Sequence, residues 1–130
     1  MKKIAIGSSM RFRDVVKETI AALESFGLQP LFPNIDYSFD NRDVAESLEE
    51  KSKLAWDHYK AIEECDAVYF ILPDGYMGTS CKIELGYALA FRKPVYFSES
   101  TGDIGLDCYP KAIIPLDKLE LLNEVYGKNQ

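Results

Sequence analysis

A short apolar run at residues 67–72 ends at Pro73-Asp74-Gly75, and a glycine-rich stretch then leads into an apolar helical pattern. The run is rich in residues that favour strands. We therefore predict a strand over residues 67–72, a helix over residues 80–92 and a second strand over residues 94–98. A helical crossover of this kind joins parallel strands. Glu84, in the first turns of the helix, is expected near the carboxyl edge of a parallel sheet, where open α/β folds bind ligands.

The same alternation runs through the whole chain. Strands are predicted over residues 3–7, 28–32, 67–72, 94–98 and 111–115, and helices over residues 12–26, 44–65, 80–92 and 116–126. Apolar faces at helical spacing are formed by Val16, Ile20 and Leu23 in the first helix and by Val44, Leu48, Ala55, Tyr59 and Ile62 in the second. Covering both faces of the sheet with right-handed crossovers favours an α/β three-layer sandwich. Its five-stranded, mostly parallel sheet is predicted in the order 2-1-3-4-5. The length of 130 residues predicts a single domain over residues 1–130.

In this strand order the chain reverses direction between the first and third strands, which opens a crevice at their carboxyl ends. The crevice lies between the loops at residues 8–13 and 73–79. In the first loop, the hydroxyls of Ser8 and Ser9, the exposed amides and the guanidiniums of Arg11 and Arg13 suit a phosphate or sugar hydroxyls. Alternatively, one of the serines only caps the turn and the arginines are solvated. Neither GxGxxG nor GxxxxGK[ST] is present, and no cofactor is expected.

The second loop and the start of the following helix offer backbone amides and hydroxyls, from Gly75, Gly78, Thr79 and Ser80. The positive end of the helix is expected to favour the ionised form of Glu84. An ionised carboxylate can attack the anomeric carbon of a sugar and form a covalent glycosyl intermediate, while a second group handles the proton of the leaving group. Alternatively, Glu84 is a surface residue that interacts with Lys82 or the helix terminus. The helix is apolar nearly all round, which argues against a surface position. It also predicts a cover on a second side, either another subunit or the C-terminal segment.

His58 is the only histidine and lies late in the second predicted helix, beside Asp57. A lone histidine without paired cysteines predicts no metal site. His58 can carry a proton near neutral pH, or it is a structural residue of the helix. Cys81 could act as a nucleophile with His58 as its base, although a buried structural cysteine is the favoured interpretation.

The net charge of −6 opposes attraction to a nucleic-acid polymer. Three cysteines without CxxC spacing, and the lack of a signal peptide or long apolar span, predict a cytoplasmic protein in a reducing compartment with no membrane partner.

Two segments together resemble one enzyme family: IGSSMRF at residues 6–12 and HYKAIEECDAVYFILPDGYMGTSCKIELGYALAFRKPV at residues 58–95. The chain resembles the nucleoside 2-deoxyribosyltransferase superfamily, which includes the deoxynucleoside 5'-monophosphate N-glycosidases. The resemblance covers most of residues 3–98. Its most specific part is Asp66, the apolar strand, the glycine-rich loop, Glu84-Leu-Gly86-Tyr-Ala88 and Lys93-Pro94-Val95.

The resemblance implies a flavodoxin-like or Rossmann-like sheet, and a homodimer or higher homo-oligomer with active sites near subunit contacts. It implies that Glu84 is the nucleophile that attacks the anomeric carbon of deoxyribose. The family positions that contact sugar, base or phosphate fall on Ser8, Ser9, Met10, Arg11, Phe12, Gly78, Thr79 and Ser80.

The chain departs from the family pattern at one position. Family enzymes commonly carry an aspartate eight residues before the aspartate that opens the third strand, and here His58 occupies that place. Asp57 and His58 are therefore both candidates for the acid–base role. A helix turns about 100° per residue, so Asp57 can replace position 58 only through a shift of register.

The sequence thus predicts an enzyme that cleaves or transfers the N-glycosidic bond of (deoxy)nucleosides or nucleoside 5'-monophosphates through a glycosyl-Glu84 intermediate. Its partner is a small-molecule nucleoside or nucleotide, and Arg11 and Arg13 favour a phosphorylated one. Alternatively, the chain is a non-catalytic nucleotide or nucleotide-sugar sensor in which Glu84 only hydrogen-bonds the sugar. A receiver-like signalling domain has the same strand order, but Leu72-Pro73 stands where its phosphoacceptor aspartate would end the third strand.

Overall fold

The computed structural model of the chain describes residues 2–33 and 47–127. Its strands are β1 (Lys3–Gly7), β2 (Gln29–Leu31), β3 (Ala67–Phe70), β4 (Val95–Phe97) and β5 (Ala112–Ile113). Its α-helices are α1 (Arg13–Ser25), α2 (Leu48–Glu64), α3 (Thr79–Ala90), α4 (Ile104–Asp107) and α5 (Glu120–Tyr126). Short 3₁₀ turns lie at Met10–Phe12, Pro73–Gly75 and Leu116–Lys118.

The five strands form one sheet in the order β2-β1-β3-β4-β5, and each neighbouring pair is parallel. In the central pair, Ile4 lies opposite Ala67 and Gly7 lies opposite Phe70. The predicted α/β class and the order 2-1-3-4-5 are therefore confirmed. The carboxyl ends of β1 and β3 lie side by side, as the switch point of this order requires.

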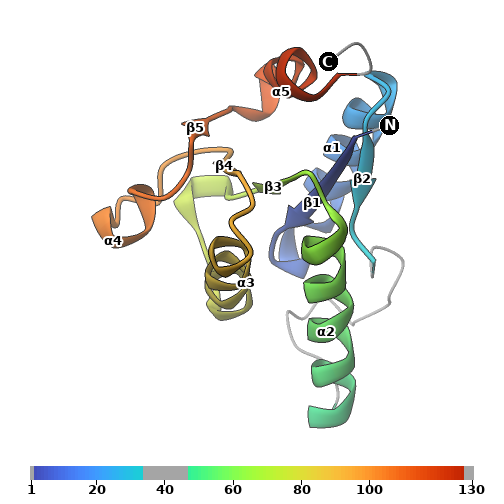
Figure 1. Ribbon diagram of the computed structural model, residues 1–130. Coiled ribbons are helices and arrows are strands. Elements are labelled where there is room, and N and C mark those ends of the chain that lie inside the picture. The colour runs from blue at the N-terminus through green and yellow to red at the C-terminus, as the bar shows by residue number, and fades with distance from the viewer. Residues whose placement is uncertain (1, 34–46, 128–130) are drawn as a thin grey trace.

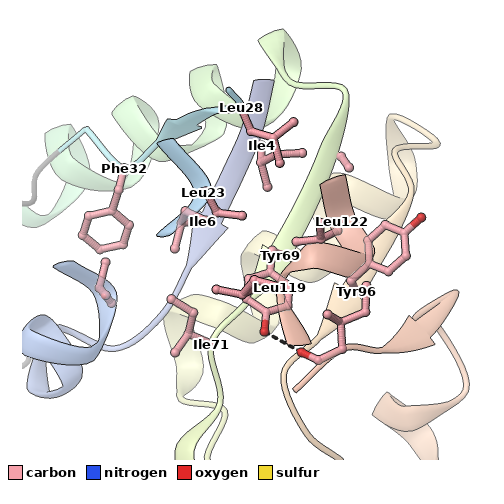
Figure 2. Close-up of a cluster of buried hydrophobic side chains, with 13 residues drawn as sticks. Ile4, Ile6, Leu23, Leu28, Phe32, Tyr69, Ile71, Tyr96, Leu119 and Leu122 are labelled. Atoms are coloured by element: carbon pink, nitrogen blue, oxygen red, sulfur yellow. Dashed lines mark hydrogen bonds between the residues drawn. The ribbon is translucent and has the colours of Figure 1, made fainter. Parts of the chain in front are cut away.

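Helices cover the sheet on both faces (Figure 1). On one face, Val16 and Leu23 of α1 and Leu122 of α5 pack in a cluster with Ile4 and Tyr69 of the sheet. Figure 2 shows this cluster, including the hydrogen bond of 2.5 Å that the Tyr69 hydroxyl donates to the carbonyl of Ile114. Because α5 packs on this face, it does not supply the second cover that the sequence predicted for α3.

The opposite face is covered by α2 and α3. Ile62 of α2 and Leu85 and Ala88 of α3 pack against Val68 and Phe70 of the sheet. This arrangement brings the two helices into contact over the half of the sheet that includes β1 and β3. Side chains on the facing sides of α2 and α3 can therefore meet near the carboxyl ends of these strands.

Several predicted boundaries differ from the structure. The helix α4 was not predicted, and the predicted strand over residues 67–72 is shorter because the Leu72 amide donates to the Ser98 hydroxyl, at 2.7 Å, and so leaves the strand ladder. Leu48 was predicted on the buried face of its helix, but its side chain is 92% exposed in the first turn of α2. Val44 lies outside the described residues.

Within residues 2–33 and 47–127, no helix is both long enough and apolar enough to cross a membrane.

Candidate active site

Glu84 lies in the second turn of α3, a helix that begins at Thr79 after the N-cap residue Gly78. Its side chain is only 7% exposed. A methyl group added at Gly7, the last residue of β1, would lie 3.3 Å from Oε1 of Glu84. The same methyl group would overlap the ring of Phe70 at the end of β3. Glycine at position 7 therefore allows the carboxylate to approach the carboxyl ends of the two central strands.

Burial raises the pKa of Glu84 from its ordinary value of 4.5 to about 8, although the positive charge of Lys51 acts in the opposite direction. The sequence predicted that the start of the helix would favour the ionised form. That direction is wrong, because removal of the carboxylate from water raises its pKa by more than the positive charge of Lys51 lowers it. With a pKa of about 8, Glu84 is mostly protonated at pH 7, and the fraction present as the attacking carboxylate grows as the pH approaches 8.

Two side chains of α2 reach the surroundings of Glu84. The ammonium of Lys51 donates a hydrogen bond of 2.7 Å to the hydroxyl of Ser80, one helical turn before Glu84. Burial first, and then the negative charge of Glu84, raise the pKa of the Tyr59 phenol. Glu84 is therefore flanked by one cationic group and one phenol, neither of which the sequence had placed in the site.

The loop at residues 8–13 is fastened to the neighbouring strand. The hydroxyl of Ser8 donates to the carbonyl of Ile71, at 3.1 Å. The hydroxyl of Ser9 accepts from the amide of Arg11, at 3.3 Å, and so caps the following 3₁₀ turn. The side chain of Met10 packs against the hydrophobic cluster under α1. These three side chains all have partners within the protein.

The two loops of the predicted crevice meet through one aromatic side chain, Tyr76. The guanidinium of Arg11 lies over its ring, 4.3 Å from the centroid, and Phe12 contacts the same ring edge-on at 6.0 Å between centroids. A methyl group added at Gly78 would lie 3.0 Å from the Tyr76 hydroxyl, so the tyrosine also covers the start of α3. Arg11 is therefore stacked on an aromatic ring, and Tyr76 is a wall residue that the sequence analysis did not single out.

The remaining predicted residues of the second loop have distinct environments. Gly75 adopts φ of +73°, and a methyl group there would lie 2.6 Å from the carbonyl oxygen of Ser100, so the turn requires glycine. Thr79 is exposed at the first position of α3. Thr79 is thus open to solvent at the start of α3, and Ser80 is half-buried beside it.

The two candidates for the acid–base role differ in their contacts. The imidazole of His58 is partly buried and contacts Phe32 edge-on, with 5.0 Å between ring centroids. Burial first, and then the charge of Lys51, lower the pKa of His58 to about 4, while Asp57 opposes this shift. His58 is therefore neutral at pH 7.

Asp57 lines a hollow of about 350 Å³ between the end of β2 and the outer side of α2. The other lining residues are Pro30, Leu31, Phe32, Pro33, Lys60, Ala61 and Glu64. None of these residues is among the neighbours of Glu84 described above. Phe32, which also lines this hollow, is the ring that His58 contacts, so both candidates lie beside the end of β2.

The candidate nucleophile Cys81 is 3% exposed and belongs to the hydrophobic cluster beneath α2 and α3. Its prediction as a buried structural cysteine is confirmed. Among the described residues, no three His, Cys, Asp or Glu side chains gather in a way that could hold a metal ion.

Comparison with known proteins places the chain in context. Residues 8–110 match the family model described as nucleoside 2-deoxyribosyltransferase. No curated protein matches the sequence. Three solved structures share the fold over most of both chains. The 2-deoxyribosyltransferase from the psychrotolerant bacterium Bacillus psychrosaccharolyticus is 20% identical and has a TM-score of 0.69, over 91% of this chain and 90% of that one.

The CMP N-glycosidase of Clostridium botulinum is 20% identical, with a TM-score of 0.56 over 96% of this chain and 100% of that one. A conserved protein from Enterococcus faecalis V583 is 14% identical, with a TM-score of 0.60 over 94% and 99% of the two chains. At these identities the three solved structures establish only that the fold is shared. The match to the family model is a separate finding and covers most of the sequence.

Proposed function

Because this chain belongs to the nucleoside 2-deoxyribosyltransferase family, we propose that it cleaves or transfers the N-glycosidic bond of (deoxy)nucleosides or nucleoside 5'-monophosphates. The observation that carries the proposal is the buried carboxyl group of Glu84, which approaches the carboxyl ends of β1 and β3 beside two loops rich in polar groups. In this proposal the chain acts as one domain in the cytoplasm, without a cofactor.

The proposed reaction has two steps. Ionised Glu84 attacks the anomeric carbon, and the base leaves with the electron pair of the N-glycosidic bond and takes up a proton from solvent water. Water or a second base then attacks the same carbon, which breaks the glycosyl ester and restores the Glu84 carboxylate. Water gives hydrolysis and a free sugar, whereas a second base gives transfer.

We propose His58 as the group that faces the leaving base. With a pKa of about 4 it is neutral at pH 7, so it would donate an N–H hydrogen bond to the base and would not deliver a proton as an imidazolium. Asp57 lines the hollow beside β2, and its effect on His58 is electrostatic. This gives Asp57 an indirect part in the proposed mechanism.

The two crevice loops would bind the substrate. The stacked guanidinium of Arg11 and the amides at the start of α3 suit a 5'-phosphate, and the hydroxyls of Ser8, Ser9, Thr79 and Ser80 suit the sugar. Phe12 and Tyr76 offer aromatic faces for the base.

A second copy of the chain would cover α2 and α3. Their outer sides carry a continuous row of aromatic contacts, from Trp56 to Tyr59, Tyr87 and Phe91. The side chain of Trp56 is 61% exposed, and those of Phe91 and Ile83 on this surface are 47% and 54% exposed. Sedimentation velocity of the wild type and Ile83→Glu tests this assembly. We expect a dimer that the charged variant weakens, and a wild-type monomer at all concentrations would contradict it.

The function is tested with a panel of nucleosides, deoxynucleosides and their 5'-monophosphates. Three proteins are compared: the wild type, Glu84→Gln and Glu18→Gln, the last an exposed residue of α1 on the opposite face of the sheet. We expect the wild type and Glu18→Gln to release free base and Glu84→Gln to release none. Equal release by all three proteins would contradict the role of Glu84.

The competing function is a non-catalytic nucleotide sensor. It is favoured by the presence of His58 at the position where family enzymes commonly carry an aspartate, while the other predicted ligand-binding residues are kept. Calorimetry separates the two functions. Tight binding of an intact nucleotide by the wild type, without release of base, would contradict the proposed enzyme and support the sensor.

A further inference from the structure

Lys51 joins the two helices that cover one face of the sheet. It lies in the first turns of α2, and its Nζ donates to the hydroxyl of Ser80 in α3, 2.7 Å away and 29 residues later in the chain. The side chain is half-buried. This hydrogen bond holds the flexible lysine side chain at one place between α2 and α3.

The place at which Lys51 is held is one turn of α3 away from the proposed nucleophile. Ser80 and Glu84 are four residues apart, so they lie on the same side of the helix. On α2, His58 follows Lys51 by seven residues, which is two helical turns and again the same side. One ammonium group therefore stands close to both groups to which the proposed mechanism assigns chemistry.

The electrostatics agree with this placement. The charge of Lys51 lowers the pKa of Glu84 against the larger effect of burial, and it also lowers the pKa of His58. Among the described residues, the other titratable groups that act on this cluster are Tyr59, beside Glu84, and Asp57, beside His58. From the sheet, β1 approaches Glu84 through Gly7, which has no side chain.

We infer that Lys51 is a positioning residue for the nucleophile: its ammonium, anchored by the Ser80 hydroxyl, supplies the counter-charge that increases the carboxylate fraction of the buried Glu84. The inference rests on the proposed function for its catalytic meaning. The hydroxyl of Ser80 then has a role in the protein itself, as the acceptor that fixes Lys51, before any substrate binds.

The same charge also keeps His58 neutral. A cation beside an imidazole disfavours the imidazolium, so Lys51 promotes the ionised form of one group and the neutral form of the other at the same pH. These are the two forms that the proposed mechanism uses.

The test compares Lys51→Met with Lys51→Arg, which restores the positive charge, and with Lys53→Met, which removes an exposed lysine from the same helix. The first readout is a ¹³C NMR titration of glutamate-labelled protein, in which the Glu84 carboxyl signal is assigned by its loss in Glu84→Gln. We expect Glu84 to titrate at higher pH in Lys51→Met than in the wild type, and the other two variants to remain near the wild type.

The second readout is kcat/KM as a function of pH. An opposite charge at short range shifts a carboxyl pKa by about one unit or more, so Lys51→Met is expected to lose about tenfold or more in kcat/KM at pH 7. The loss should shrink as the pH rises, because Glu84 then ionises without help. A structural defect alone would lower the rate equally at all pH values.

An unchanged Glu84 titration in folded Lys51→Met would overturn the inference. Because the NMR titration needs no turnover, it decides this point even if the wild type releases no base, a result that would refute the proposed function separately. If Lys51→Met does not fold, Ser80→Ala replaces it. Loss of the anchor should also move the Glu84 titration to higher pH, and an unchanged titration would again overturn the inference.

Discussion

The burial of Glu84 should make the stability of the protein depend on pH in a way that Glu84→Gln abolishes. The pKa of this carboxyl group is raised from 4.5 to about 8 in the folded state, chiefly by burial. Between these two pH values the unfolded chain has lost the proton and the folded chain retains it. The contribution of Glu84 to the free energy of unfolding therefore falls as the pH rises, by about 1.4 kcal/mol per pH unit.

The whole effect, summed from pH 4.5 to pH 8, amounts to about 5 kcal/mol, which is large against the 5–15 kcal/mol that stabilises an ordinary domain. Glutamine has nearly the same shape and no charge. Glu84→Gln should therefore come close to the wild type at pH 4.5, where Glu84 is protonated in the folded state and still half protonated in the unfolded chain, and should be several kcal/mol more stable at pH 8.

The assay is urea denaturation of the wild type, Glu84→Gln and the exposed control Glu18→Gln at a series of pH values from 4.5 to 9. The difference between wild type and variant isolates Glu84, because contributions from other groups are largely shared. We expect this difference to grow with pH for Glu84→Gln and to stay near zero for Glu18→Gln. Parallel curves for the wild type and Glu84→Gln would refute the reasoning that burial penalises the carboxylate.

Three further variants test the surroundings of the site. Gly7→Ala should reduce stability by about 1–3 kcal/mol in urea denaturation, because the new methyl group overlaps the buried Phe70 ring; unchanged stability would show that the ring can move aside. Ser98→Ala should cost about 1–3 kcal/mol in the same assay, since the buried amide of Leu72 loses its acceptor, and a neutral effect would mean that another group replaces the hydroxyl. His58 has its pKa lowered to about 4 by burial, so its own contribution to stability should rise by about 1.4 kcal/mol per pH unit from pH 4 to 6.5, opposite in sign to that of Glu84; the stability of the wild type relative to His58→Gln should therefore rise over this range, and parallel curves for the two proteins would contradict the assignment.

Much of the fold follows from local sequence patterns. The apolar runs and the helical spacing of residues such as Val16 and Leu23 place the elements, and the handedness of the crossovers then fixes the strand order. The helix α4 escaped prediction because it spans only Ile104–Asp107, too few residues for a periodic pattern. The one available signal was its cap, Asp103, which accepts a hydrogen bond of 2.8 Å from the Gly105 amide.

A site residue could be predicted only where the sequence around it is enough to place it in the fold. The place of Glu84 follows from its own strand, loop and helix. The approach of Lys51 does not, because it depends on how α2 crosses α3, and no local pattern records that contact. The direction of the Glu84 pKa shift was predicted wrongly because the helix terminus is visible in the sequence, whereas the depth of burial is set by the whole fold. Gly7 was a missed signal, since a glycine that ends a buried strand often marks a close approach.

The central claim is that Glu84 forms a covalent bond to the sugar, and mass spectrometry tests it most directly. The wild type and Glu84→Gln would be incubated with a 2-fluoro-substituted nucleoside 5'-monophosphate, whose electronegative substituent slows breakdown of the glycosyl ester, and then quenched in acid. We predict one glycosyl group on the wild-type peptide that contains Glu84 and none on the variant. Release of base at equal rates by both proteins, with no adduct on that peptide, would contradict the account.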